Sequence, residues 1–247
     1  MEAYTRYGIP FGGQFLQRKE WEFVTIAQAL SERGMLKDNR KGVGFGVGKE
    51  LLPALFANHG CRILATDKVD DCDGVWHDHW PKNREALAYP AICSRDSFDA
   101  NVTFERIDMN AIPQTITGYD FSWSCSSLEH LGSLQNGFEF LLRQMDCLKP
   151  GGWAIHTTEF NLFSNYRTLV TPNTVLYRRR DIEYLKVELS RRGHCLAPVD
   201  FNQGSEIEDW FIAHPPFDDA RKNLAHLRTL LGPYVCTSLL LIIQKAS

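Results

Sequence analysis

The sequence lacks a long hydrophobic run, and it lacks the cysteine pairs that hold zinc or a disulfide framework. Its longest apolar run, Leu239 to Ile243, is far too short to span a bilayer. Its seven cysteines are an odd number and form no C-x-x-C pair. The opening stretch MEAYTRYGIPFGG lacks the charged start and apolar run of a signal peptide. We therefore expect reduced thiols, no membrane span and a cytoplasmic location.

The chain also lacks an excess of charge of either sign. Its formal net charge is −3 and its pI is about 6.2, so nothing attracts it generally to nucleic acid or to an anionic membrane. We expect no nucleic-acid partner. With 247 residues and 44% hydrophobic composition, the chain is long enough for one domain with a full core. We therefore expect a single domain over residues 1–247.

A cluster of glycines stands out in the stretch KGVGFGVGKE, residues 41–50. Gly44, Gly46 and Gly48 occupy alternate positions where a short strand gives way to a helix expected over Lys49 to Asn58. Glycine permits positive φ and lets a ligand lie against bare backbone, while the start of a helix offers free N–H groups. The cluster predicts a nucleotide site, with an ordinary tight turn as the alternative.

The spacing of these glycines separates three classes of cofactor. A dinucleotide fingerprint that starts at Gly44 needs glycine at position 49, where this chain has Lys49. A phosphate-binding loop that ends at Gly48 needs glycine and a hydroxyl where Val43 and Glu50 stand. What remains is the pattern G-x-G-x-G.

An acidic residue follows the next expected strand, Arg62 to Thr66. Asp67 ends this strand and comes 23 residues after Gly44, close to the spacing of about 20 in nucleotide-binding βαβ units. Open α/β sheets bind ligands at the carboxyl ends of their strands, and a carboxylate there can accept hydrogen bonds from both ribose hydroxyls. The alternative is a solvated aspartate in a turn. The glycine cluster and Asp67 together favour a nucleoside site.

Three features resemble the class I S-adenosylmethionine-dependent methyltransferases: the G-x-G-x-G turn followed by an acid, the S-x-x-E-H-L turn that begins at Ser126, and LKPGG at residues 148–152. The resemblance covers roughly residues 40–160. It implies an α/β fold: a three-layer Rossmann-like sandwich with a mostly parallel seven-stranded sheet whose last strand is antiparallel. It also implies S-adenosylmethionine as the cofactor.

The resemblance assigns roles to individual residues. Asp108 would accept from the adenine amino group, and Met109 would pack on the adenine ring. The cofactor-binding set that it implies is Gly44, Phe45, Gly46, Gly48, Asp67, Lys68, Asp108, Met109 and Ser126. One departure is Gly42, which stands where many members have an acid that braces the turn, and Glu50 is a candidate substitute.

Catalytic candidates follow the next two strands. Glu129 and His130 come after the strand expected at Tyr119 to Ser126, and Glu159 comes after the strand expected at Trp153 to Thr158. His130 and Glu159 are candidate bases for a hydroxyl acceptor. A related group that acts on RNA ends uses a similar E-H turn to hold a divalent metal, but Ser126 stands where that group has its first glutamate. A metal therefore stays open, as do ordinary capping roles for both side chains of the E-H pair.

The segments outside this core are expected to cover it. Residues 1–35 form an N-terminal lid and helix, with the helix over Arg18 to Leu30, although the aromatic residues before it could simply pack on the sheet edge. Residues 202–236 form a substrate cover with a short helix that ends near Leu231, between strands at His194 to Phe201 and Thr237 to Lys245. This tail resembles, diffusely, methyltransferases that modify bacterial polysaccharides and glycolipids.

Two other stretches suggest a metal site and an anion site, and each also has an ordinary structural explanation. DDCDGVWHDHW, residues 70–80, mixes acids and histidines without regular ligand spacing, which favours a solvated loop over a metal site. Arg178, Arg179 and Arg180 are read as a solvated surface or as an anion site.

The resulting hypothesis is S-adenosylmethionine-dependent O-methylation of a small-molecule or glycan acceptor. Two alternatives remain: a non-catalytic module that binds S-adenosylmethionine, and an NAD-dependent oxidoreductase, which Lys49 disfavours.

Overall fold

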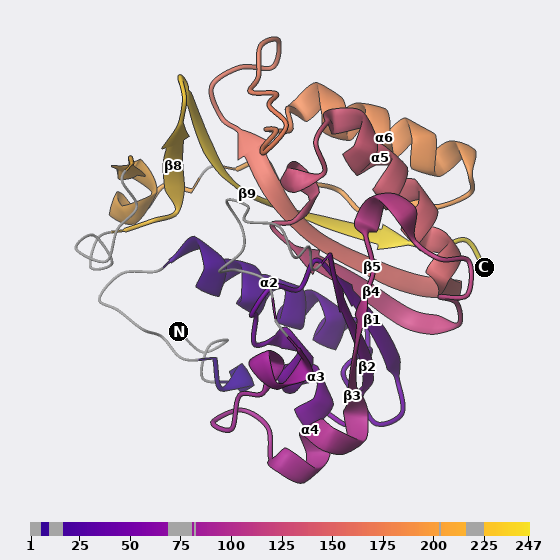
Figure 1. The fold of residues 1–247 in the computed structure, drawn as a ribbon. Helices are drawn as coiled ribbons and strands as arrows, with labels where there is room; N and C mark the ends of the chain where they lie inside the picture. The colour runs from indigo at the N-terminus through magenta and orange to yellow at the C-terminus, as the bar shows by residue number, and fades with distance from the viewer. Residues whose placement is uncertain (1–5, 10–16, 69–80, 82, 203, 216–224) are drawn as a thin grey trace.

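One mixed β-sheet forms the middle of the molecule (Figure 1). The computed structural model describes residues 6–9, 17–68, 81, 83–202, 204–215 and 225–247. The strands in these ranges follow the order β3-β2-β1-β4-β5-β9-β8-β7, and β6 pairs with the far end of β9. They are β1 (Lys41–Phe45), β2 (Arg62–Asp67), β3 (Val102–Arg106), β4 (Tyr119–Cys125), β5 (Leu148–Asn161), β6 (Cys195–Leu196), β7 (Ile212–Ala213), β8 (Arg228–Leu231) and β9 (Tyr234–Gln244).

Helices cover both faces of the sheet, as Figure 1 shows. One core lies between the sheet and α2, α3 and α4, and the other lies between the sheet and α5 and α6. The helices are α2 (Arg18–Glu32), α3 (Leu52–Asn58), α4 (Arg95–Asn101), α5 (Leu134–Arg143) and α6 (Arg179–Arg191), with 3₁₀ turns η1 (Arg84–Leu87), η2 (Met109–Ala111), η3 (Leu128–His130), η4 (Gln144–Cys147) and η5 (Ile207–Trp210). The three-layer sandwich is confirmed.

The course of the strands is confirmed, but their number differs from the prediction. Strands β1 to β5 pair in parallel and β9 runs antiparallel to β5, as expected. The described residues contribute nine strands instead of seven. The helix predicted to end near Leu231 is wrong, because β8 and β9 form a hairpin in which Leu231 pairs with Tyr234. Gly232, at φ +57°, supplies the left-handed residue that this short turn needs.

Several predicted boundaries also shift. Helix α3 begins at Leu52 instead of Lys49, and the strand expected over His194 to Phe201 is limited to Cys195–Leu196. Helix α5 ends at Arg143, and the chain continues as η4. Strand β5 begins at Leu148, so LKPGG forms its first residues. A proline is tolerated there because it lies at the start of the strand.

Several segments meet at the edge of the sheet that is formed by the carboxyl ends of its parallel strands. Strands β1, β2, β4 and β5 are parallel, so their carboxyl ends meet there. Helix α2 begins at the same edge, since Lys19 Nζ donates to the Cys125 carbonyl at 3.1 Å and Arg18 Nη1 lies 2.9 Å from Glu159 Oε1. This edge holds most of the residues that the sequence singled out.

Gly44 packs against a tryptophan, so its replacement by alanine is expected to destabilise the fold. A Cβ on Gly44 would overlap the Trp123 ring, which is fully buried and packs edge-on against Phe56 at 4.9 Å between ring centroids. Overpacking of this kind costs about 1–3 kcal/mol. Urea unfolding of Gly44→Ala measures it. A loss under about 0.5 kcal/mol, as at an ordinary surface site, would contradict this packing.

Candidate functional site

The glycine turn lies between β1 and α3 and contacts the ends of two other segments. Gly46 and Gly48 have φ of +60° and +53°, a conformation that side chains with a Cβ rarely adopt. A Cβ on Gly46 would lie 2.7 Å from Ser127 Oγ and 3.0 Å from Met109 Sδ. Ser127 Oγ also donates to the Gly46 carbonyl at 2.8 Å. Glycine is therefore required at this position by both conformation and space.

The carboxylate of Asp67 holds the glycine turn through the backbone of Gly48. Its Oδ2 accepts the Gly48 amide N–H at 2.7 Å, and the residue is buried at the end of β2. Burial raises the pKa of Asp67 to about 6, although the backbone amides of Gly48 and Lys68 oppose that rise. This contact braces the glycine turn, a role that Gly42 cannot fill because it has no side chain.

Glu50 takes another role. Its Oε1 accepts the indole N–H of Trp123 at 2.6 Å, and burial raises the pKa of the carboxyl to about 8. The prediction that Glu50 replaces the missing brace is therefore wrong, because its carboxyl binds a tryptophan in β4.

The predicted adenine-binding pair lies beside the turn. Asp108 Oδ1 accepts the Asn110 amide N–H at 2.8 Å and caps η2, and its Oδ2 lies 3.3 Å from Lys68 Nζ. Met109 is buried against Gly46. The structure therefore brings Asp67, Lys68, Asp108 and Met109 around the glycine turn, whereas the side chain of Phe45 is fully buried in the core.

Ser126 connects β4 to helix α2. It adopts φ +49°, which is uncommon for a residue with a side chain. Its Oγ donates to Glu22 Oε1 at 2.6 Å, and its amide donates to the Thr157 carbonyl at 3.2 Å. These bonds hold the strained residue in place, as is frequent at functional sites.

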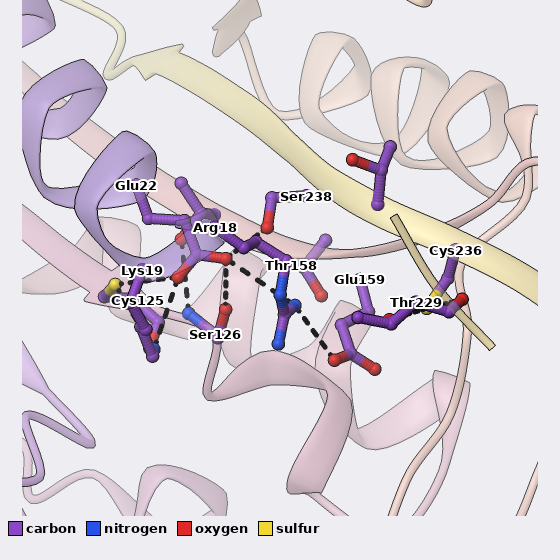
Figure 2. A network of polar contacts seen from close by, with 12 residues as sticks. Arg18, Lys19, Glu22, Cys125, Ser126, Thr158, Glu159, Thr229, Cys236 and Ser238 are labelled. Carbon is purple, nitrogen blue, oxygen red and sulfur yellow. Dashed lines mark hydrogen bonds and ion pairs between the residues drawn. The ribbon is translucent and has the colours of Figure 1, made fainter. Parts of the chain in front are cut away.

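Glu22 is the centre of a buried network in Figure 2 that the sequence did not reveal. Its Oε1 also accepts from Ser238 Oγ, and its Oε2 lies 3.3 Å from Lys19 Nζ. Burial would raise the pKa of Glu22, but Lys19, Arg18 and the two serine hydroxyls lower it to about 2. Glu22 lies four residues after Arg18 and three after Lys19, a spacing that is typical of exposed helix pairs. Nothing local therefore predicted its burial.

The catalytic candidates gather at the ends of β4 and β5. Glu129 is fully buried, and its Oε2 accepts from Thr158 Oγ1 at 2.9 Å. Burial and the nearby charge of Glu129 raise the pKa of Glu159, while Arg18 and His130 oppose that rise. His130 Nδ1 lies 2.7 Å from the Asn173 carbonyl, so Nδ1 carries a proton and donates it to that oxygen. The structure brings all three side chains into electrostatic contact.

Asn161, the last residue of β5, has a structural role. Its side-chain N–H groups donate to the Arg167 carbonyl at 3.0 Å and to Thr168 Oγ1 at 3.2 Å. Its Oδ1 accepts from the Phe163 amide at 2.8 Å. These contacts shape the loop that follows β5.

The comparisons with known proteins agree on the fold. No family model matches the sequence, and no curated protein matches it either. Among solved structures, a Galdieria sulphuraria protein provisionally named a sarcosine dimethylglycine methyltransferase superposes with a TM-score of 0.60 at 13% identity, over 98% of this chain and 96% of the other. The chain has the fold of the class I S-adenosylmethionine-dependent methyltransferases.

Two further structures show the range of proteins with this methyltransferase fold. The 1,6-didemethyltoxoflavin-N1-methyltransferase of Burkholderia thailandensis, solved with S-adenosylhomocysteine, has a TM-score of 0.56 at 14% identity over 90% of this chain and 76% of the other. The [4+2]-cyclase SpnF has a TM-score of 0.51 at 16% identity over 72% of this chain and 60% of the other. The fold therefore limits the function without deciding it.

The glycine turn of this methyltransferase fold fits a nucleoside. Gly46 and Gly48 present backbone without side chains, and Asp67 lies under them at the end of β2. The Asp67 carboxylate accepts the backbone amides of Gly48 and Lys68, and since a carboxylate has about four acceptor sites, capacity remains for hydroxyl donors. The residues present are compatible with S-adenosylmethionine.

A metal finds less support among the described residues. No group of three or more His, Cys, Asp or Glu in these ranges is arranged to hold an ion. The acidic and histidine-rich stretch at residues 70–80 lies outside the described residues. The metal hypothesis for His130 and Glu129 stays a prediction.

Two of the three adjacent arginines have side chains that pair with carboxylates. Arg178 binds Asp181 through Nε at 2.7 Å and Nη2 at 2.9 Å. Arg179 pairs with Glu183 at 3.0 Å and lies over the ring of Phe201. These contacts favour the structural interpretation of the arginine run over an anion site.

The two predicted covers are described only in part. Tyr7 is buried and donates to Gln28 Oε1 at 2.8 Å, so it packs on α2, while residues 1–5 and 10–16 lie outside the described residues. In the 202–236 segment, Trp210 is exposed and Arg228 lies over its ring. Residues 203 and 216–224 lie outside the described residues. Both covers therefore stay predictions.

The six described cysteines are all free, and Cys195 alone among them is exposed. No helix in the described ranges has the length and apolar character needed to cross a membrane.

Proposed function

We propose that this protein is an S-adenosylmethionine-dependent methyltransferase that methylates a hydroxyl group of a small-molecule or glycan acceptor. The observation that carries the proposal is the set of side chains at the carboxyl ends of the parallel strands. There the glycine turn braced by Asp67 lies beside the cluster of Glu129, His130 and Glu159. The fold agrees with the proposal, since the similar structures include methyltransferases.

The chain supplies positioning and a proton acceptor. When bound, S-adenosylmethionine provides the methyl group on a positively charged sulfur. Gly46, Gly48 and Asp67 orient the nucleoside, with Asp108 and Met109 at the adenine side. A methyl transfer is mostly a matter of alignment, but a hydroxyl must lose its proton as it reacts.

Two side chains are placed to take that proton. The first is His130, whose ring is oriented by the hydrogen bond from Nδ1 to the Asn173 carbonyl, so that Nε2 is the nitrogen that would accept the proton. Glu159 interacts with His130 electrostatically, and burial together with the charge of Glu129 raises the pKa of Glu159, against the opposing charge of Arg18. Lys19 and Arg18 belong to the wall of the same edge, where they contact Cys125 and Glu159.

The direct test is product formation. Candidate hydroxyl compounds are incubated with S-adenosylmethionine carrying a labelled methyl group, and mass spectrometry follows the label. Transfer to an oxygen supports the proposal. Binding of S-adenosylmethionine without transfer to any acceptor would favour the non-catalytic binding module, and binding of NAD instead would favour the oxidoreductase.

Asp67→Ala is expected to weaken the binding of S-adenosylhomocysteine by about 1.5–3 kcal/mol, the range for hydrogen bonds to a charged group. The variant removes the acceptor for the ribose and the brace on Gly48. Calorimetry measures the affinity, and Asp67→Asn, which keeps an acceptor for Gly48, is the matched control. Wild-type affinity in Asp67→Ala, or tight NAD binding without a response to S-adenosylhomocysteine, would contradict this assignment.

A further inference from the structure

Two buried carboxylates beside the predicted methyl-transfer site each keep one oxygen without a partner. Glu129 Oε2 accepts from Thr158 Oγ1 at 2.9 Å, and Glu159 Oε1 lies 2.9 Å from Arg18 Nη1. Within the described residues, Glu129 Oε1 and Glu159 Oε2 are buried and have no hydrogen-bond partner. Buried polar oxygens are nearly always bonded, so each of these two requires an explanation.

The charges around the two carboxylates do not balance. Glu22 is matched by Lys19 and by the hydroxyls of Ser126 and Ser238. Among the described residues, Arg18 is a permanent cation whose charge acts on Glu129 and Glu159, and also on Glu22; its Nε and Nη1 are themselves buried without a hydrogen-bond partner. His130 and the thiol of Cys236 also face this pair, but neither carries a permanent positive charge. An uncompensated buried carboxylate is costly, and a cationic ligand removes that cost.

The chemistry of the two free oxygens favours an ammonium group over a second hydroxyl. A hydroxyl has one proton to donate, so it can satisfy one of the two oxygens. A primary ammonium has three protons and a full charge, so it can bond to both oxygens at once. The two oxygens are themselves buried; the side chain of Glu159 is 8% exposed and Glu129 is fully buried, so the pair lies nearest to solvent at Glu159.

We infer that the acceptor carries a protonated primary amine next to its reacting hydroxyl, as amino alcohols and amino sugars do, and that Glu129 Oε1 and Glu159 Oε2 bind this amine. The inference rests on the proposed methyl transfer and names its substrate class. Binding needs no covalent step. The amine fixes the acceptor at the ends of β4 and β5, and the neighbouring hydroxyl then lies near His130.

The experiment compares amines with neutral compounds of matched shape. Glucosamine is titrated against glucose, and ethanolamine against ethylene glycol, by calorimetry with and without saturating S-adenosylhomocysteine. The amines are expected to bind at least about tenfold more tightly than their neutral partners, since a charge-assisted bond is worth about 1.5–3 kcal/mol. Equal affinity within each pair, or no binding by either amine, would overturn the inference.

Variants locate the binding site. Glu129→Gln keeps an acceptor for Thr158 but removes the charge, and it is expected to abolish the preference for amines while leaving the affinity for S-adenosylhomocysteine unchanged. Glu159→Gln provides a second test if the first variant does not fold. Glu183→Gln, on the exposed face of α6, should keep the preference. A preference for amines that survives both Glu129→Gln and Glu159→Gln would also overturn the inference.

The outcome for the cofactor is separate. If S-adenosylhomocysteine does not bind to the wild type, the proposed function fails, and the titrations without it still report on the amine site. If S-adenosylhomocysteine binds and the amines do not, the substrate class fails alone.

Discussion

Replacing His130 with alanine is expected to lower turnover by about 10²–10⁴-fold, the contribution of a positioned general base. The reason is the orientation of the ring. Nδ1 is bonded to the Asn173 carbonyl at 2.7 Å, so Nε2 is the nitrogen that would accept the proton. Because the proposal gives His130 the role of a base and not of a cofactor ligand, affinity for S-adenosylhomocysteine should stay nearly unchanged. Steady-state kinetics and calorimetry on the same variant measure the two effects.

The matched control is His194→Ala. His194 precedes β6 at the opposite edge of the sheet, where its Nδ1 accepts the Ala246 amide N–H at 3.2 Å. Its loss should leave turnover unchanged. A metal role for His130 predicts instead that EDTA abolishes wild-type activity and that Mg²⁺ or Mn²⁺ restores it. Full turnover by His130→Ala, with no effect of chelation, would remove both roles.

Glu22→Gln is expected to lower the free energy of unfolding by about 3–5 kcal/mol, the usual cost of removing one partner from a buried ion pair. The fully buried Glu22 carboxylate receives Ser126 and Ser238 hydroxyls and lies near Lys19 and Arg18. A glutamine keeps the volume but leaves the two cations without their counter-charge. Urea unfolding at pH 7 gives the difference.

The same carboxylate makes stability depend on pH. The pKa of Glu22 is lowered from 4.5 to about 2 on folding. Its contribution is therefore present above pH 4.5 and is lost as pH falls through that range toward 2. A shift of this size corresponds to about 3 kcal/mol, in agreement with the estimate for the substitution. Glu22→Gln should lack this part of the acid destabilisation.

The control for this prediction is Glu32→Gln, near the end of the same helix. The side chain of Glu32 is 58% exposed, so its replacement should change stability by less than about 0.5 kcal/mol. If Glu22→Gln and Glu32→Gln unfold at similar urea concentrations, the network does not stabilise the fold as described. The network also joins α2 to β4 and β9, so its loss should loosen the wall of the candidate site.

Local patterns were sufficient for much of the fold. The runs of residues in β1, β2 and β4, the amphipathic α2 and the glycine turn were all predicted, because strand and helix periodicity are properties of neighbouring residues. The resemblance of G-x-G-x-G, S-x-x-E-H-L and LKPGG supplied the class of fold, which the structure confirms. The β8–β9 hairpin was missed although Gly232 and Pro233 gave a turn signal, since the surrounding segment was interpreted as a cover with a helix.

The sequence by itself determined which runs of residues can form strands. It also determined that Asp67 lies at the end of a strand and that Glu129, His130 and Glu159 follow two others. Only the tertiary structure decided what these side chains contact. Glu50 bonds to Trp123 across 73 residues, and Glu22 bonds to Ser126 and Ser238 across 104 and 216. Such pairings depend on which strands become neighbours and on how α2 docks over their ends. The free energy of burying a charge is set by that packing, and helical spacing alone does not reveal it.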